Sequence, residues 1–117
     1  MGRLSTHVLD TVAGSPAEGV SWTLFRLEGE ARSQLSSGKT NSDGRTDEAL
    51  LEGDAVVVGT YELVFQVAGY FKARGTELSD PPFLDEIPLR FSIFDANQNY
   101  HVPLLVSPYS YSTYRGS

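Results

Sequence analysis

Residues 61–67 read YELVFQV, and this stretch gives the clearest indication of the fold. It is rich in aromatic and β-branched residues, and its two polar side chains, Glu62 and Gln66, fall on one face when positions alternate. A period of two is typical of a strand with one face in a core and the other toward solvent. The stretch Tyr61–Val67 therefore predicts a half-buried β-strand.

Similar stretches lie on both sides of this one along the chain. They are Trp22–Leu27, Leu89–Phe94, Tyr100–Val106 and the strand-like tail Tyr109–Tyr114. Pro103 lies inside the third, and because proline has no N–H for a sheet ladder, it indicates an edge, a bulge or a strand margin. The turn sequences Asn41–Gly44 and Asp95–Asn99 are expected to join antiparallel neighbours. Short strands separated by turn residues predict an all-β sandwich or barrel.

One short helix is predicted at Gly69–Gly75, after the central strand. The stretch ends in Arg74 and then Gly75, a residue suited to the left-handed conformation that ends many helices. The segment Thr76–Pro82 contains two prolines and is predicted to be an exposed loop.

The length of 117 residues fits a single domain, residues 1–117. Hydrophobic residues make up 40% and charged residues 21%, as in globular proteins, and no apolar run is long enough to span a bilayer. The N-terminal residues lack the apolar core of a secretory signal. We therefore expect a protein without membrane association, located in the cytoplasm.

The charge and the cysteine content restrict the chemistry. A net charge of −6, with 9 basic residues spread singly, offers no patch for a phosphate backbone, so nucleic acid is not expected as a partner. Cysteine is absent, which excludes disulfides and thiolate chemistry.

Only two histidines, His7 and His101, are available for acid–base work near neutral pH. Alternation places His7 on the same strand face as Ser5 and Leu9, a face of mixed polarity. The neighbours of His101 on its own face are apolar. Either imidazole can serve catalysis or be a hydrogen-bonded structural group, and the sequence leaves both interpretations open.

Other reactive groups give weaker signals. The two histidines lie far apart in sequence and show no metal-binding spacing, so no metal site is predicted, and no nucleophile elbow occurs. Arg45 follows the turn at Gly44, where its guanidinium can bind a carbonyl or an anionic oxygen, or simply be solvated. The aromatic tail runs to Ser117, which indicates either a docked, functional end or an edge strand that stops there.

Four segments together resemble one known family. They are Leu4–Asp10, Gly14–Ala17, Thr40–Arg45 and, most specifically, His101–Ser117 with its closing Tyr-Arg-Gly-Ser. This pattern resembles the 5-hydroxyisourate hydrolases of the transthyretin-like protein family. The likeness spans nearly the whole chain, and the segment Thr76–Glu86 is its least familiar part.

The resemblance implies a transthyretin-like β-sandwich of seven or eight strands in two antiparallel sheets with one short helix. It also implies a homotetramer, a dimer of dimers with its active sites in the channel between dimers. His7, Arg45, His101 and Ser117 match the family's catalytic positions, and His7, Arg45 and Tyr114 match its substrate-binding positions. The implied reaction opens the six-membered ring of 5-hydroxyisourate, a step in the degradation of urate to allantoin, and needs no cofactor.

Two other functions are compatible with such a sandwich. One is a transthyretin-type carrier that binds an aromatic ligand without catalysis. The other is a non-catalytic sandwich attached to a larger enzyme. A carrier has no need of two histidines, an arginine and a fixed Tyr-Arg-Gly-Ser end, so the sequence favours the hydrolase.

Overall fold

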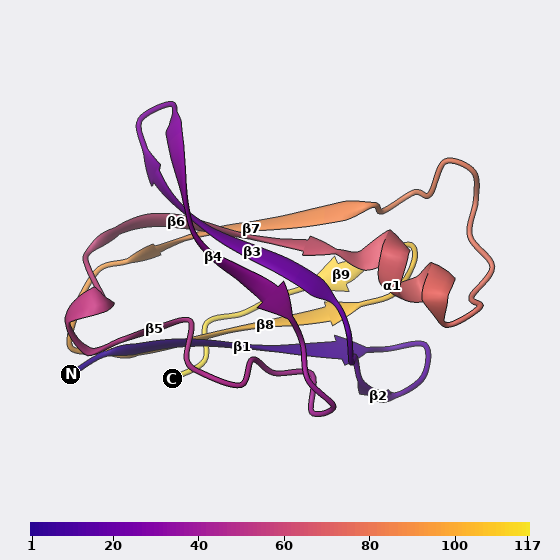
Figure 1. The fold of residues 1–117 in the computed structure, drawn as a ribbon, viewed down its shortest axis with the longest axis horizontal. Coiled ribbons are helices and arrows are strands. Elements are labelled where there is room, and N and C mark those ends of the chain that lie inside the picture. Colours follow the sequence, from indigo (N-terminus) through magenta and orange to yellow (C-terminus); the bar gives the residue numbers. More distant parts are fainter.

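The computed structural model describes all residues, 1–117, as two sheets packed face to face (Figure 1). Sheet A has the order β2-β1-β8-β9, with β5 also paired to β1, and sheet B has the order β4-β3-β6-β7. The strands are β1 Arg3–Asp10, β2 Ser15–Pro16, β3 Ser21–Glu28, β4 Ala31–Lys39, β5 Leu51–Glu52, β6 Gly59–Gln66, β7 Glu86–Ile93, β8 Asn99–Val106 and β9 Tyr111–Ser112. A 3₁₀ turn, η1 Gly53–Ala55, and one helix, α1 Val67–Ala73, complete the elements.

The core lies between the sheets and follows from the alternation along each strand. Every second residue of β1 and β8 is buried there, and the strands of sheet B supply the opposite wall. The largest fully buried side chains are Tyr61, Phe65, Phe71, Leu4, Leu24, Leu63, Ile87, Ile93 and Leu104. The alternate positions of sheet A face away from this core, and they carry the histidines.

The predicted fold class is confirmed, and each predicted central strand has a counterpart in the structure. β3, β6, β7 and β8 cover the predicted stretches with small shifts at their ends. The prediction of a half-buried strand was wrong for β6, because it is a central strand between β3 and β7 and its residues Tyr61–Phe65 are all buried. The helix begins at Val67, two residues earlier than predicted, and Gly75 follows it with a φ of +78° in the left-handed region. Residues 76–82 form a loop that is largely exposed. No helix in the structure has the length and apolarity needed to cross a membrane.

One long strand was absent from the sequence prediction. β4 pairs with β3 at the edge of sheet B, and eight of its nine residues are exposed. A strand that is solvated on both faces has no apolar alternation to mark it. The hairpin of β3 and β4 projects from the sandwich (Figure 1).

The strand directions differ in one respect from the predicted pair of antiparallel sheets. β1 and β8 run parallel, with eight residue pairs in register from Arg3–Asn99 to Asp10–Val106. All other pairings are antiparallel. Parallel neighbours need a long connection, and here nearly the whole chain lies between the two strands. This pairing brings residues from opposite ends of the sequence together.

Pro103 lies where β8 has a strand neighbour on one side only. The backbone of His101 pairs with Gly116, and Leu105 pairs with Ser112, but no residue pairs with Pro103 on that side. Its missing N–H therefore costs no ladder hydrogen bond. Of the predicted strand-like tail, only Tyr111–Ser112 forms a strand, and the chain returns to β8 at Gly116.

Candidate functional site

The two histidines lie close together on the outer face of sheet A. In the parallel register, Ser5 is opposite His101 and His7 is opposite Pro103. Successive side chains alternate between faces, so His7, Ser5 and His101 all project away from the core. The imidazole centroids are 6.5 Å apart, and the ring planes meet at 46°. Both histidines are half-buried.

A tight turn brings Arg45 to the same face. Asn41 Oδ1 accepts hydrogen bonds from two backbone N–H groups of the turn, including that of Arg45 at 3.1 Å. Gly44 has a φ of +74°, and its carbonyl accepts a 2.8 Å hydrogen bond from the backbone N–H of Val8. A Cβ on Gly44 would collide with the Val8 carbonyl oxygen. Only glycine therefore lets the turn lie so close to β1.

The last residues of the chain lie along β8. Gly116 exchanges two backbone hydrogen bonds with His101, donating one of 2.7 Å and accepting one of 3.0 Å. The guanidinium of Arg115 donates a 3.0 Å hydrogen bond to the carbonyl of Asn99. These contacts hold the tail on the strand and direct Ser117 to the cavity that His101 lines.

A cavity of about 400 Å³ lies between β1, β8, the Arg45 loop and the tail, and we name it the β1–β8 cavity. It is lined by Arg3, Ser5, Thr6, Arg45, Thr46, Glu48, Ala49, Asn99, Tyr100, His101 and Ser117. Its volume falls in the range of small-molecule sites, roughly 300–1,000 Å³. Most of its lining side chains are polar or charged, which suits a small ligand with several carbonyl and N–H groups.

The surroundings of both imidazoles favour their neutral forms. Burial lowers the pKa of His101, and the positive charge of Arg45 and the neighbouring His7 lower it further. Burial also lowers the pKa of His7, with a smaller contribution from Arg45, while Asp43 acts in the opposite direction. A neutral imidazole can accept a proton, so the arrangement suits general-base chemistry near neutral pH.

Several polar groups of the site have no partner within the chain. His7 Nε2 is buried and makes no hydrogen bond. The guanidinium of Arg45 takes part in none of the ion pairs or side-chain hydrogen bonds of the structure. Buried polar groups without partners are rare in folded proteins. Arg45 is exposed and lines the β1–β8 cavity, so its guanidinium is available to a ligand there, whereas Nε2 of His7 is buried and does not line the cavity.

The structure brings four of the five predicted site residues together. Arg45, His101 and Ser117 line the β1–β8 cavity, and His7 does not line it, but its ring centroid lies 6.5 Å from that of His101. Tyr114 is more than half exposed and lines a different cavity of about 330 Å³, between β7 and the tail. Within one chain, Tyr114 is therefore not at the cavity of the other four.

The sequence analysis did not identify Ser5 as a functional residue. Its hydroxyl lies 2.9 Å from Nδ1 of His101. Alternation had placed Ser5 on the face of His7, but its contact with His101 depends on the parallel register of β1 and β8, which has no local signal. No group of three or more His, Cys, Asp or Glu side chains is arranged to hold a metal ion.

Comparison with protein families and relatives gives a consistent result. The sequence model of the HIUase/Transthyretin family matches residues 4–116. A protein of Rhizobium meliloti named 5-hydroxyisourate hydrolase 2 is 59% identical over 99% of this chain and 97% of its own length. A 5-hydroxyisourate hydrolase of Ralstonia nicotianae is 55% identical over the full length of both chains.

Solved structures agree with these relatives. An (S)-allantoin synthase superposes with a TM-score of 0.94 at 49% identity, over 99% of this chain and 44% of that longer chain. The 5-hydroxyisourate hydrolase of Klebsiella pneumoniae gives a TM-score of 0.81 at 34% identity over the full length of both chains. Sea bream transthyretin in complex with thyroxine gives a TM-score of 0.86 at 25% identity, over 97% of this chain and 94% of that one.

Proposed function

The chain belongs to the HIUase/Transthyretin family, and we propose that the β1–β8 cavity is its active site for the hydrolysis of 5-hydroxyisourate. The chain is a hydrolase of this kind, since full-length relatives that are 55–59% identical carry the name 5-hydroxyisourate hydrolase. The proposal concerns the residues and the mechanism. The observation that carries it is the meeting of Arg45, His101 and Ser117 at one cavity, with His7 beside them.

The reaction adds water to a carbonyl of the six-membered ring and breaks the adjacent C–N bond. An imidazole takes a proton from the attacking water, and the ring nitrogen receives a proton as it leaves. The product carries a new carboxylate and is 2-oxo-4-hydroxy-4-carboxy-5-ureidoimidazoline, which lies on the route from urate to allantoin. These steps need no cofactor.

Arg45 and Ser117 act on the substrate in this mechanism. Negative charge develops on the carbonyl oxygen during attack, and a positioned guanidinium stabilises this oxyanion. Since Arg45 has no ion-pair partner in the chain, its charge is available for that purpose. The hydroxyl of Ser117 can hydrogen-bond the substrate or the attacking water.

The carrier alternative fits this cavity less well. Pockets for aromatic ligands are lined mainly by apolar and aromatic side chains. Most residues of the β1–β8 cavity are polar, and they include two arginines and a glutamate, Arg3, Arg45 and Glu48. Such a lining favours the polar ring of 5-hydroxyisourate over an aromatic hormone.

The direct test uses freshly prepared 5-hydroxyisourate and follows its ultraviolet absorbance against the spontaneous decay. The protein is expected to accelerate the decay, and His101→Asn is expected to lower kcat by roughly 10²- to 10⁴-fold, the contribution of one general base. Circular dichroism and the thermal midpoint check that the variant is folded. A folded His101→Asn variant with a near-normal rate would contradict the proposed site.

We extend the proposal to a homotetramer, a dimer of dimers, and to a cytoplasmic location. The position of Tyr114 supports the assembly: it lies away from the β1–β8 cavity of its own chain, so a substrate-binding role requires the Tyr114 of another copy. Light scattering would measure the mass in solution, and a monomer with full turnover would contradict the assembly. Cell fractionation would test the location.

A further inference from the structure

Ser5 makes the only side-chain hydrogen bond to His101. Its Oγ lies 2.9 Å from His101 Nδ1, within the normal range for this kind of bond. The two residues are direct neighbours in the parallel register of β1 and β8. The backbone pairing of two regular strands therefore fixes the distance between them.

This bond leaves Nε2 as the one ring nitrogen of His101 that is free to react. His101 Nε2 has no partner in the chain, and it is not among the buried unpartnered atoms. His7 differs, because its Nε2 is buried and its ring does not line the cavity. His101 is thus the imidazole with an accessible nitrogen at the β1–β8 cavity.

Gly116 confines the ring of His101 on another side. A Cβ placed on Gly116 would lie 3.0 Å from Cβ and 3.3 Å from Cδ2 of His101. These distances are tighter than ordinary contacts, so the absence of a side chain lets the tail pack directly on the imidazole. The tail restricts the position of the ring, but it offers the ring nitrogens no hydrogen bond. Only Ser5 can select which ring nitrogen carries a proton.

We propose that Ser5 is a positioning residue, whose hydroxyl holds His101 in one orientation and one tautomer with Nε2 presented to the substrate. In the resting enzyme Ser5 accepts a hydrogen bond from Nδ1–H, which leaves the lone pair on Nε2. When Nε2 takes the proton from water, Nδ1 keeps its proton and its bond to Ser5. The same contact therefore serves both charge states of the ring. This inference rests on the proposed function of the β1–β8 cavity.

A different role for Ser5 leads to a different kinetic result. Ser5 also lines the cavity, so its hydroxyl can instead bind the substrate directly. Loss of a contact made equally to substrate and transition state raises KM and leaves kcat unchanged. Loss of the orientation of His101 lowers kcat and leaves KM nearly unchanged.

The kinetic test compares three variants of the full-length protein. Ser5→Ala is expected to lower kcat roughly 10- to 100-fold, the scale for losing a partner that orients a metal-ligating histidine. Ser5→Thr keeps the hydroxyl and suits a strand, so it is expected to restore most of kcat. The matched control is Ser92→Ala on sheet B, which removes a serine hydroxyl 3.2 Å from Thr60 Oγ1 and should change neither constant. A Ser5→Ala variant with kcat within twofold of the unmodified protein, or with a raised KM alone, would overturn the inference.

A second measurement does not depend on turnover. The chain has two histidines, so its imidazole ¹⁵N spectrum contains two sets of signals, which His7→Asn would assign. His101 is expected to show one tautomer with a protonated Nδ1, and Ser5→Ala is expected to shift it toward a mixture. A mixture in the unmodified protein, or an unchanged pattern in Ser5→Ala, would overturn the positioning role. If the unmodified protein does not accelerate substrate decay, the proposed function fails while this spectrum still tests the Ser5–His101 contact.

Discussion

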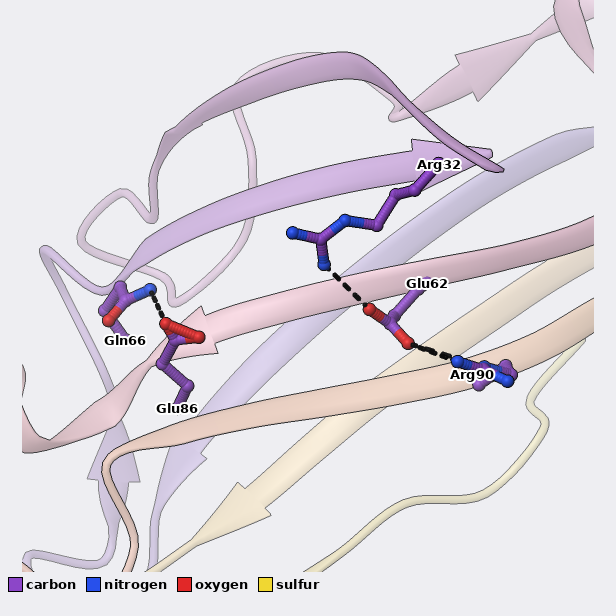
Figure 2. A network of polar contacts seen from close by, with 5 residues as sticks. All are labelled: Arg32, Glu62, Gln66, Glu86 and Arg90. Atoms are coloured by element: carbon purple, nitrogen blue, oxygen red, sulfur yellow. Dashed lines mark hydrogen bonds and ion pairs between the residues drawn. The ribbon is translucent and has the colours of Figure 1, made fainter. Parts of the chain in front are cut away.

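The outer faces of the two sheets both carry partly buried polar groups, but only one face satisfies them. On sheet B, Glu62 of β6 is nearly buried, and each of its carboxylate oxygens has an arginine partner (Figure 2). Arg32 approaches from β4 to 3.2 Å, and Arg90 approaches from the register-paired position on β7 to 3.2 Å. The guanidinium of Arg32 also lies 3.8 Å from the centre of the Phe25 ring, which belongs to β3, the strand between β4 and β6.

The outer face of sheet A has the opposite character. The guanidinium of Arg45 has no ion-pair partner, and Nε2 of His7 is buried without a hydrogen bond. Arg45 is exposed, so its charge is solvated rather than matched, whereas the desolvation cost of His7 Nε2 is not offset within the chain. On sheet B the charges are matched internally and contribute to stability. On sheet A they are left for a ligand, and this difference identifies the functional face.

The strongest way to test this contrast is to remove one arginine from each face. Arg45→Gln is expected to lower kcat by roughly 10²- to 10³-fold, because it removes the charge that stabilises the oxyanion. Arg90→Gln makes the same chemical change on sheet B and should leave kcat within about twofold. Steady-state rates on 5-hydroxyisourate measure both variants, and equal losses would remove the distinction between the faces.

The reciprocal test concerns stability. Glu62→Gln keeps the shape of the side chain and removes its charge, so the two arginine contacts weaken. Both arginines are more than half exposed and can be solvated again, so the expected loss is about 1 kcal/mol of unfolding free energy. Urea unfolding would measure it, and kcat should not change. A fall in kcat of the folded Glu62→Gln variant would show that sheet B takes part in the reaction.

How far the sequence predicts each face depends on how local its signal is. Alternation predicted β6 because one face of Tyr61–Val67 packs in the core, and the residue types of Asn41–Gly44 predicted a turn. The expectation that this turn and Asp95–Asn99 join antiparallel neighbours was wrong, because each connects a strand of sheet B to a strand of sheet A. β4 was missed because a strand that is exposed on both faces carries no such pattern. The ion pair between Glu62 and Arg32 could therefore not be predicted either, since Arg32 lies on β4.

The assembly of the site could not be derived from local patterns. His7 and His101 lie close together because β1 pairs in parallel with β8. Nearly the whole chain separates these strands, so no turn sequence indicates that they pair. The tail was predicted as a continuous strand from Tyr109 to Tyr114, whereas its decisive contact is Gly116 against His101. This contact depends on a missing side chain, for which the alternation of polar and apolar residues gives no signal. Only the family resemblance indicated that these residues belong together.

The mildest test of the contrast is the pH dependence that the face of sheet A should show. Burial, and then the charge of Arg45, lower the pKa of His101 below 6.5, and the surrounding groups are His7 and Arg3 on β1 and Glu48 on the loop. The neutral imidazole is the reactive form, so kcat/KM should fall only as the pH drops through this lowered pKa. At pH 6.5 more than half of the plateau rate should therefore remain.

The stability of the fold should also decrease as the pH falls, as kcat/KM does. Between the folded pKa and about 6.5 the unfolded chain binds more protons than the folded one, so stability decreases as the pH falls through this window. Arg90→Gln should leave the acid midpoint of kcat/KM unchanged, because Arg90 lies on the other sheet. An acid midpoint at or above 6.5 would mean that Arg45 and the buried surroundings do not hold His101 neutral. The unpaired charge of Arg45 would then have no influence on the imidazole beside it, and the contrast between the two faces would lose its electrostatic basis.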